Sequence, residues 1–288
     1  MQTNTIYCGE CAEMMRRHLL DNSIDLTVTS PPYDDLREYN GYTFEFEPIA
    51  TELWRVTKPG GVVVWVVADA TVNGSETGTS FFQADVFMGL GFNLHDTMIY
   101  QQMGTGAKGS NFAYWQAFDF MFVFSKGEPK AVNRIADHKN VKAGSVTGSS
   151  PKMNRLNSRT ERGRRVVPEY SVRQNVWVYP AHKGDTTDHP APFPEALARD
   201  HIISWSNPGD IVLDPMCGSG TTLKMAVEQG REYIGIDISQ EYCDLATKRV
   251  VGARVPLPGL TVTAHNKQNA GELLQPGLLG LDAPEKSK

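Results

Sequence analysis

The sequence predicts an α/β fold built on a doubly wound, mostly parallel sheet. Segments with strand character alternate along the chain with segments of helical spacing, an order typical of parallel sheets flanked by helices. The segment Val62–Ala68 is an uninterrupted, valine-rich apolar run, as expected for a strand that is buried on both faces. With 288 residues, 40% of them hydrophobic, the chain is long enough for one large domain or a domain with an insert.

The first half of the chain is expected to contribute four strands and two helices. Ile24–Thr29 alternates apolar and polar residues and stops at a proline pair, which indicates a strand that runs into a turn. Thr79–Leu90 opens with Thr-Ser and then places Phe82, Val86 and Leu90 at helical spacing. The expected elements are strand 24–29, helix 46–56, strand 62–68, helix 79–90 and strands 98–102 and 118–124.

The second half becomes regular again after a basic stretch. A short strand at 176–179 is followed by a Pro-rich segment, and then helices and strands alternate. In the first of these helices, Leu197 and Ile202 are expected to face the core. The expected elements are helix 195–205, strand 211–213, helix 220–229, strand 233–236 and helix 240–250. The tail after Pro256 has little pattern and is expected to pack loosely.

Several classes of protein do not fit this composition. The longest apolar run is far shorter than the roughly 20 residues of a membrane helix, and the N-terminus lacks the pattern of a signal peptide. A soluble cytoplasmic protein with no membrane partner is therefore expected. Of the four cysteines only Cys8 and Cys11 have Cys-x-x-Cys spacing, and no second pair of ligands follows. We expect buried thiols in a reducing compartment and no metal site.

Charge is distributed unevenly along the chain. The net charge is −5, but residues 126–173 hold twelve Lys and Arg against four acidic residues, so the rest of the chain carries −13. An acidic body with one basic insert is typical of a surface that faces phosphates. A solvated, partly disordered loop would have the same composition. The two interpretations are compatible, since such segments often become ordered on binding nucleic acid.

A glycine-rich turn lies between the predicted strand 211–213 and the helix that follows it. Residues 214–222 read Asp-Pro-Met-Cys-Gly-Ser-Gly-Thr-Thr, and their glycines allow the backbone to approach a ligand at the carboxyl edge of the sheet. The segment matches neither a P-loop nor a Gly-x-Gly-x-x-Gly motif. Asp237 ends the next predicted strand, where an acid can accept hydrogen bonds from both ribose hydroxyls. These features favour a nucleoside cofactor over a tight turn without a ligand.

A second motif follows the predicted strand 24–29. Ser30, Pro31, Pro32 and Tyr33 resemble the catalytic motif of DNA amino-methyltransferases, and residues 214–222 resemble the S-adenosylmethionine loop of the same family. Segments 56–61, 122–127 and 189–194 are also similar to family segments, so the resemblance covers most of residues 5–250. The catalytic motif precedes the cofactor motif, which matches the permuted β-class order.

The resemblance implies a Rossmann-like methyltransferase fold that uses S-adenosyl-L-methionine. It divides the chain into a catalytic half (1–126), a basic target-recognition region (127–175), a cofactor-binding half (176–255) and a loosely packed tail (256–288). The implied cofactor-binding residues are Asp214, Pro215, Met216, Gly218, Ser219, Gly220, Thr221, Asp237 and Glu10. Met216 stands where the family usually has Phe, and Cys8-Gly9-Glu10 stands where it commonly has Gly-Asp. The expected DNA-binding residues are Arg155, Arg159, Arg162, Arg164 and Arg165.

The chemistry of an exocyclic amine explains the residue types of the catalytic motif. The nitrogen lone pair is delocalised into the base, so acceptors aimed at both amine hydrogens are needed to favour a tetrahedral nitrogen. The Ser30 hydroxyl and the carbonyl of Pro31 can serve as these acceptors, and Tyr33 can stack on a base that has left the duplex. A Pro-rich turn with a buried tyrosine is the alternative without function.

Ser at the first motif position is associated in this family with cytosine-N4 methylation, whereas Asp usually means adenine-N6. The sequence thus indicates a site-specific DNA methyltransferase that acts on cytosine N4 in double-stranded DNA, in restriction-modification or DNA self-marking. Adenine-N6 methylation is the main alternative. Methylation of an amide or an RNA base, and a non-catalytic DNA-binding module with a decayed fold, are further alternatives. A cognate restriction endonuclease and a dimer are both left open by the sequence.

Overall fold

The computed structural model of the chain describes residues 1–32, 44–103, 114–147, 152–153, 159–160, 165–180 and 194–253. The chain forms two compact units. The first is made of residues 1–134 and 174–256, and the second contains residues 135–173. The first unit is an α/β domain, and the second is a slender β-ribbon.

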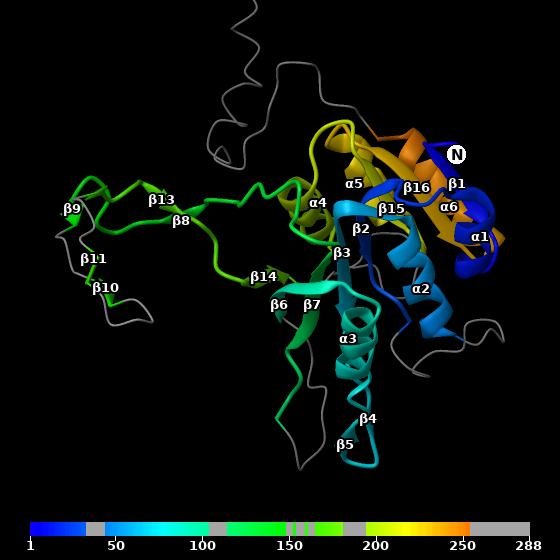
Figure 1. Cartoon of the computed structure of the whole chain (residues 1–288), viewed down its shortest axis with the longest axis horizontal. Helices are drawn as coiled ribbons and strands as arrows, with labels where there is room; N and C mark the ends of the chain where they lie inside the picture. The colour runs from blue at the N-terminus through cyan, green and yellow to red at the C-terminus, as the bar shows by residue number, and fades with distance from the viewer. Residues whose placement is uncertain are drawn as a thin grey trace, which may run out of the picture. The chain divides into compact units, whose positions relative to one another are not determined.

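An eight-stranded sheet forms the centre of the α/β domain (Figure 1). Seven of its strands run parallel, and β7 alone is antiparallel to both of its neighbours. This arrangement confirms the predicted doubly wound, mostly parallel sheet. The strands lie in the order β1 (Thr5–Cys8), β16 (Glu232–Asp237), β15 (Ile211–Asp214), β2 (Ile24–Thr29), β3 (Thr57–Val67), β7 (Phe118–Ser125), β6 (Asn93–Met103) and β14 (Val176–Pro180).

Six helices in the described residues cover the sheet. On one face lie α1 (Cys11–His18), α2 (Phe46–Val56) and α3 (Thr79–Gly89), which share one core cluster. On the other face lie α4 (Glu195–Trp205) and α5 (Thr221–Glu228), and α6 (Gln240–Val251) packs beside α5. A small hairpin of β4 (Thr71–Val72) and β5 (Ser75–Glu76) precedes α3. No helix in the described part of the chain is long and apolar enough to cross a membrane.

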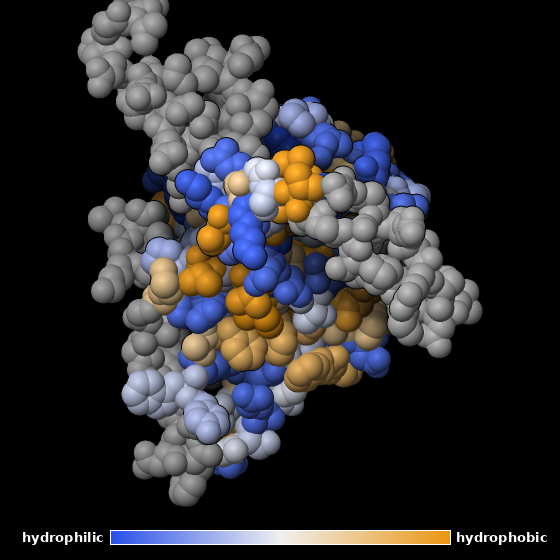
Figure 2. All heavy atoms as spheres, turned by 90° about the vertical axis from the view of Figure 1, so that its left-hand side faces the viewer, coloured by the Kyte–Doolittle hydropathy of each residue, from blue (hydrophilic) through white to orange (hydrophobic). Residues whose placement is uncertain are grey.

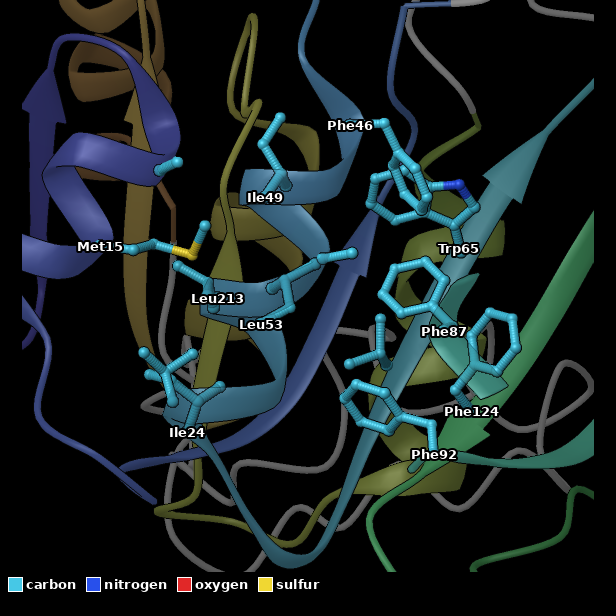
Figure 3. Packing of buried hydrophobic residues seen from close by; sticks show 14 of the residues in the cluster. Met15, Ile24, Phe46, Ile49, Leu53, Trp65, Phe87, Phe92, Phe124 and Leu213 are labelled. Atoms are coloured by element: carbon cyan, nitrogen blue, oxygen red, sulfur yellow. The ribbon is translucent and has the colours of Figure 1, made fainter. Parts of the chain in front are cut away.

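Aromatic residues dominate the core beneath α2 and α3 (Figure 3). The ring centroids of Trp65 and Phe87 are 5.2 Å apart, and those of Phe87 and Phe124 are 4.6 Å apart. The Trp65 indole N–H donates to the Gln83 side chain at 2.7 Å, so its polar group is satisfied inside the core. This packing anchors β3 and β7, the two strands beyond β2.

The buried face of α3 differs from the prediction. The helix is present at nearly the predicted bounds, but Phe82 is 53% exposed, and Val86 and Leu90 are only partly buried. Phe87 is buried instead, on a face that includes two polar residues, Ser80 and Gln83. Two polar side chains in and just after β3 account for this face, because the Trp65 indole and the Asp69 carboxylate both find partners on α3. Gln83 satisfies the Trp65 indole, and Ser80 donates from both its backbone N–H and its hydroxyl to the Asp69 carboxylate.

The first strand and helix of the structure are absent from the sequence prediction. β1 is short and partly exposed, and it pairs only with β16 at the edge of the sheet. At the start of α1, both carboxylate oxygens of Glu10 accept backbone N–H groups, from Ala12 at 2.8 Å and Glu13 at 2.7 Å. Glu is not among the residues usually preferred at this position, so the sequence carries no strong start signal here.

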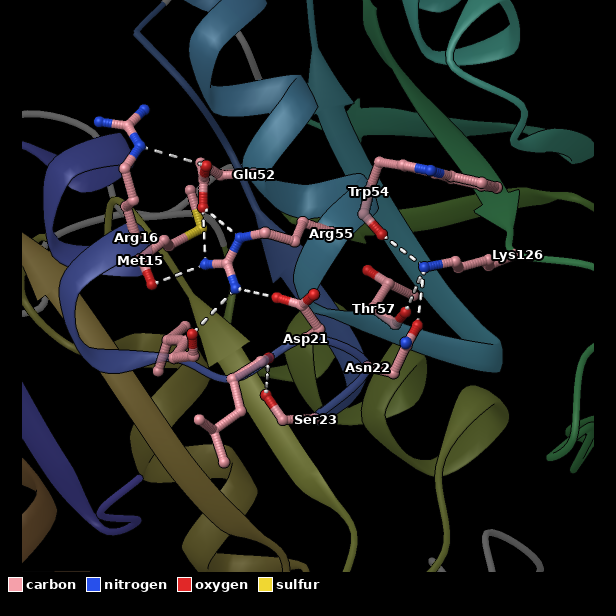
Figure 4. Close-up of polar contacts among 12 residues, drawn as sticks. Met15, Arg16, Asp21, Asn22, Ser23, Glu52, Trp54, Arg55, Thr57 and Lys126 are labelled. Atoms are coloured by element: carbon pink, nitrogen blue, oxygen red, sulfur yellow. Dashed lines mark hydrogen bonds and ion pairs between the residues drawn. The ribbon is translucent and has the colours of Figure 1, made fainter.

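Polar contacts tie the loops at the amino edge of the sheet together (Figure 4). The Arg55 guanidinium donates to the backbone carbonyls of Met15 and Leu19, which end α1. The Lys126 ammonium donates to the carbonyl of Trp54 at 2.7 Å and lies 4.5 Å from the centroid of its ring. These contacts join α1, α2 and the end of β7 on the side of the sheet away from the carboxyl edge.

The second unit is built from three antiparallel strand pairs nested one inside the next. They are β8 (His138–Lys139) with β13 (Tyr170–Ser171), β9 (Val146–Thr147) with β12 (Arg165–Val166), and β10 (Lys152–Met153) with β11 (Arg159–Thr160). The sequence did not predict these pairs. The ribbon exposes hydrophobic side chains, among them Val146 and Val166. Figure 2 shows one face of the molecule, on which hydrophobic residues lie among hydrophilic ones.

Candidate active site

The two sequence motifs meet at neighbouring strand ends. Ser30 directly follows β2, and Asp214 is the last residue of β15. β2 and β15 are parallel neighbours, with Leu26 opposite Val212 and Thr27 opposite Leu213. Their carboxyl ends therefore open at the same edge of the sheet, although Ser30 and Asp214 are 184 positions apart in sequence.

Two threonine hydroxyls connect the motifs directly. Thr29 Oγ1 donates to Asp214 Oδ1 at 2.8 Å, in a buried contact. Thr222 Oγ1, in the first turn of α5, donates to the carbonyl oxygen of Val28 at 3.2 Å. The end of the strand that carries Ser30 is thus held to both sides of the glycine-rich turn.

Asp214 is an acid of the site that is buried and has a raised pKa. Its residue is only 2% exposed, and this burial raises the pKa of Asp214 to about 6. The hydroxyls of Thr29 and Thr222 and the backbone N–H of Met216 favour the ionised form and oppose the rise, while the charge of Asp237 adds to it. At neutral pH Asp214 is therefore mostly ionised, held as an acceptor by these donors.

The glycine-rich turn has a backbone that other residues would strain. Gly218 has φ +47° and Gly220 has φ +80°, and Gly220 N–H donates to the Cys217 carbonyl at 2.7 Å. A Cβ atom on Gly220 would lie 2.8 Å from the Cβ of Ala246 in α6. The turn is therefore glycine-dependent both for its conformation and for the close approach of α6.

Asp237 lies beside this turn at the end of β16. Its Oδ2 accepts the N–H of Gly218 at 2.8 Å, and its Oδ1 accepts the N–H of Ser239 at 2.9 Å. Burial raises the pKa of Asp237, while these N–H groups oppose the rise. A carboxylate at a strand end beside a glycine turn fits the ribose of a nucleoside cofactor, and partly buried Met216 fits the face of its aromatic base.

The other predicted cofactor residues surround the same edge. Pro215 directly follows Asp214. Gly9 and Glu10 follow the end of β1, and the backbone N–H of Gly9 donates to the Asp237 carbonyl at 2.9 Å. The Glu10 carboxylate caps α1 in the structure. Ser219 and Thr221 are both buried and accept hydrogen bonds from Arg249.

The structure describes only part of the other predicted sites. Ser30 and Pro32 are partly exposed and Pro31 is buried at the sheet edge, whereas Tyr33 lies outside the described residues. Arg165 is exposed on β12, and Arg159 lies in β11, where only the backbone is described. Three further predicted DNA-binding residues lie outside the described residues: Arg155, Arg162 and Arg164.

The residues that the structure describes include no candidate metal site. The expectation of buried thiols is right for Cys217 and Cys243 and wrong for Cys8, which is exposed at the end of the edge strand β1, while Cys11 is partly buried; all four are free thiols. Within the described ranges, no group of three or more His, Cys, Asp and Glu side chains is placed to hold an ion.

Four residues that shape the site are not among the predicted catalytic or cofactor-binding residues: Thr29, Thr222, Glu195 and Arg249. A signal existed for Thr29, because a polar side chain in a central strand of a sheet is buried and most such groups are hydrogen-bonded. No local signal pointed to Glu195 or Arg249, which come from separate helices: Arg249 contacts the turn, and Glu195 contacts Arg249.

Comparisons with known proteins agree with this geometry. Residues 24–248 match the N6/N4 DNA methylase family model. The orphan methyltransferase M.BamHII of Bacillus amyloliquefaciens is 54% identical over 245 residues, covering 82% of this chain and 92% of that protein. The fold is similar to that of the PvuII DNA methyltransferase (cytosine-N4-specific), with a TM-score of 0.63, 19% identity and 86% of each chain covered.

The M1.HpyAVI complex with S-adenosylmethionine gives a TM-score of 0.57 at 21% identity, covering 85% of this chain and 98% of that one. These structural likenesses show the fold, while the family model and the high identity to M.BamHII show the family. The chain belongs to the N6/N4 family of DNA methylases, the S-adenosylmethionine-dependent enzymes that its two motifs resemble.

Proposed function

We propose that the protein transfers a methyl group from S-adenosyl-L-methionine to the exocyclic N4 of cytosine in double-stranded DNA. The observation that carries this proposal is the buried hydrogen bond between Thr29 and Asp214, because it fixes the Ser30 motif against the glycine-rich turn. The proposed cofactor-binding residues are those of the turn together with Asp237, and the proposed catalytic residues are Ser30, Pro31, Pro32 and Tyr33.

The roles of the catalytic residues follow from the chemistry of the amine. The Ser30 hydroxyl oxygen and the Pro31 carbonyl oxygen accept the two hydrogens on N4, which directs the nitrogen lone pair away from the ring. The rigid proline pair holds the second acceptor in place. The cofactor, when bound, would supply an electrophilic methyl group on a sulfonium. The nitrogen would form a bond to this methyl group as the sulfur–methyl bond breaks, S-adenosylhomocysteine would leave as a neutral thioether, and the nitrogen would lose one proton to solvent. No covalent enzyme intermediate is required, so alignment and hydrogen bonding account for the rate.

The β-ribbon supports the proposal that residues 127–175 recognise the DNA. A two-stranded β-ribbon has the width that the major groove of B-DNA admits. Exposed Arg165 on β12 lies among the basic residues that give segment 126–173 its net charge of +8. We propose that Arg155, Arg159, Arg162, Arg164 and Arg165 bind guanine edges and phosphates. In a cell the activity would serve restriction-modification or DNA self-marking.

Ser30 is the feature that favours cytosine over adenine, because family members with Ser at this position are mostly cytosine-N4 enzymes. The test is to incubate the purified protein with unmethylated DNA of broad sequence and S-adenosylmethionine, digest the DNA to nucleosides and measure their masses. N4-methylcytosine is the expected product. N6-methyladenine would overturn the choice of base and leave the mechanism intact. If neither product forms and the protein still binds DNA, the result would support the non-catalytic alternative.

A further inference from the structure

Arg249 lies in the last turn of α6, and its side chain contacts the glycine-rich turn. Its Nη1 donates to the Ser219 carbonyl at 3.0 Å, to Ser219 Oγ at 2.7 Å and, more weakly, to Thr221 Oγ1 at 3.3 Å. The Arg249 side chain is only 15% exposed, so these hydrogen bonds are largely shielded from water. One guanidinium thus contacts the turn on both sides of Gly220.

Glu195 orients this guanidinium from a different helix. Arg249 Nη2 lies 2.8 Å from Glu195 Oε1, and the same oxygen accepts Lys224 Nζ at 2.7 Å. Burial alone would raise the pKa of Glu195, but the hydrogen bonds and charges of Lys224 and Arg249 outweigh it and leave the pKa below its ordinary value. Glu195 therefore stays ionised at neutral pH and joins the first turn of α4 to α5 and α6.

We propose that Arg249 and Glu195 are positioning residues that hold the Ser219–Thr221 turn in the conformation that accepts S-adenosylmethionine. The inference rests on the proposed cofactor site. Glycine gives a turn more conformational freedom than other residues do, so a turn with Gly218 and Gly220 loses more entropy when a ligand orders it. A guanidinium presents donors in a fixed planar fork, and here Nη2 is held by Glu195 while Nη1 contacts the Ser219 carbonyl and the hydroxyls of Ser219 and Thr221 before the cofactor arrives. Preorganisation of this kind strengthens binding by lowering its entropic cost.

The cofactor affinity of full-length variants tests this role. In Arg249→Met the apolar stem is kept and every hydrogen bond from the guanidinium to the turn is removed, and we expect the Kd for S-adenosylmethionine, measured by titration calorimetry, to rise about tenfold. Arg249→Lys keeps the charge without the planar fork and should recover only part of the affinity. Because Glu195 acts through Arg249, adding Glu195→Gln to Arg249→Met should weaken binding little further.

Kinetics separate positioning from simple stabilisation of the fold. For Arg249→Met we expect KM for S-adenosylmethionine to rise, while KM for DNA and the transfer rate at saturating cofactor stay within about twofold. The matched control is Arg231→Met. Arg231 donates to the Ser206 carbonyl at 2.7 Å and to the Gln229 carbonyl at 2.6 Å, ahead of β16 at the amino edge. Its loss should lower thermal stability without changing the Kd for the cofactor.

Asp237→Ala separates a failure of this inference from a failure of the proposed site. If Asp237→Ala weakens cofactor binding and neither Arg249 variant does, the positioning role is wrong and the site stands. Unchanged binding in Asp237→Ala would remove the turn from the cofactor site and overturn both. Should Arg249→Met not fold, Arg249→Lys and Glu195→Gln carry the same test. Equal losses of affinity in Arg249→Lys and Arg231→Met would also contradict the role.

Discussion

Thr29 Oγ1 donates a hydrogen bond to Asp214 Oδ1 at 2.8 Å, and both residues are buried. Thr29 precedes Ser30, the proposed amine acceptor, and Asp214 opens the turn that we propose holds the cofactor. The contact would therefore couple the position of the acceptor to the position of the methyl donor. In a reaction that depends on alignment, this coupling matters more than the stability that one hydrogen bond provides.

Replacement of Thr29 by valine should break this hydrogen bond while preserving shape. Ionised Asp214 would be deprived of a buried donor, so at pH 8 we expect the free energy of unfolding to fall by about 1–3 kcal/mol. The loss should be smaller at pH 5, where Asp214 is protonated. Urea denaturation at both pH values measures the effect, and Thr29→Ser, which keeps the hydroxyl, is the control. The same loss in both variants would mean that the methyl group of Thr29 matters and the hydrogen bond does not.

The raised pKa of Asp214 predicts a pH dependence of stability. The folded-state pKa of about 6 lies above the unfolded value of about 3.9, so the folded protein binds this proton more tightly. The resulting stabilisation is present at low pH and is lost as pH rises from about 4 through 6. Asp214→Asn does not titrate. Between pH 5 and pH 7 the wild type should therefore lose about 1 kcal/mol relative to this variant in urea denaturation. A difference that does not change with pH would show that Asp214 titrates outside this range.

Gly220 offers a test of the turn itself. Gly220→Ala would force an L-residue to φ +80° and place its Cβ 2.8 Å from that of Ala246, and we expect a loss of about 3 kcal/mol in the free energy of unfolding. Gly230 has φ +72° with no atom within 4 Å of an added Cβ, so Gly230→Ala isolates the backbone cost, about 1 kcal/mol. Thermal or urea denaturation compares them. Equal losses would show that α6 moves away from the turn without cost.

The basic ribbon should contribute to DNA binding mainly through phosphates. Neutralising Arg162, Arg164 and Arg165 together should weaken binding and flatten the dependence of log K on log salt, by about 0.9 for each phosphate that the protein no longer neutralises. Fluorescence anisotropy with a labelled duplex at several salt concentrations measures this slope. Arg17→Gln, on the exposed side of α1, is the control and should leave the slope unchanged. A wild-type slope in the triple variant would remove these arginines from the interface.

Much of the sheet and the place of both motifs could be predicted from sequence. The valine-rich run of β3 is buried on both faces and predicts a strand, and the alternation of β2 with the proline pair after it predicts a second one. The start of β3 was not predicted, because Pro59, Gly60 and Gly61 lie inside the strand. Helix α4 was predicted with its observed bounds, and Leu197 and Ile202 are fully buried as expected. Sheets of this kind bind ligands at the carboxyl ends of their strands, which allowed the site to be placed before the strand order was known.

The remaining features depend on contacts between distant segments. β1 is partly exposed and carries no clear pattern, and it becomes a strand because β16 offers an open edge. The face of α3 is set by the Trp65 indole, a partner that helical spacing does not reveal. The ribbon strands are two residues long and hold together through backbone pairing, which has little dependence on side-chain identity.

The measurement that tests the central claim most directly is methyl transfer by Ser30→Ala in a single turnover with cofactor already bound. If the Ser30 hydroxyl accepts an amine hydrogen in the transition state, this variant should keep the wild-type Kd for S-adenosylmethionine and transfer the methyl group about a hundredfold more slowly. Ser30→Asp, which restores an acceptor, should recover part of the rate. An undiminished transfer rate in Ser30→Ala would contradict the mechanism, and the amine would then have to be activated by other residues.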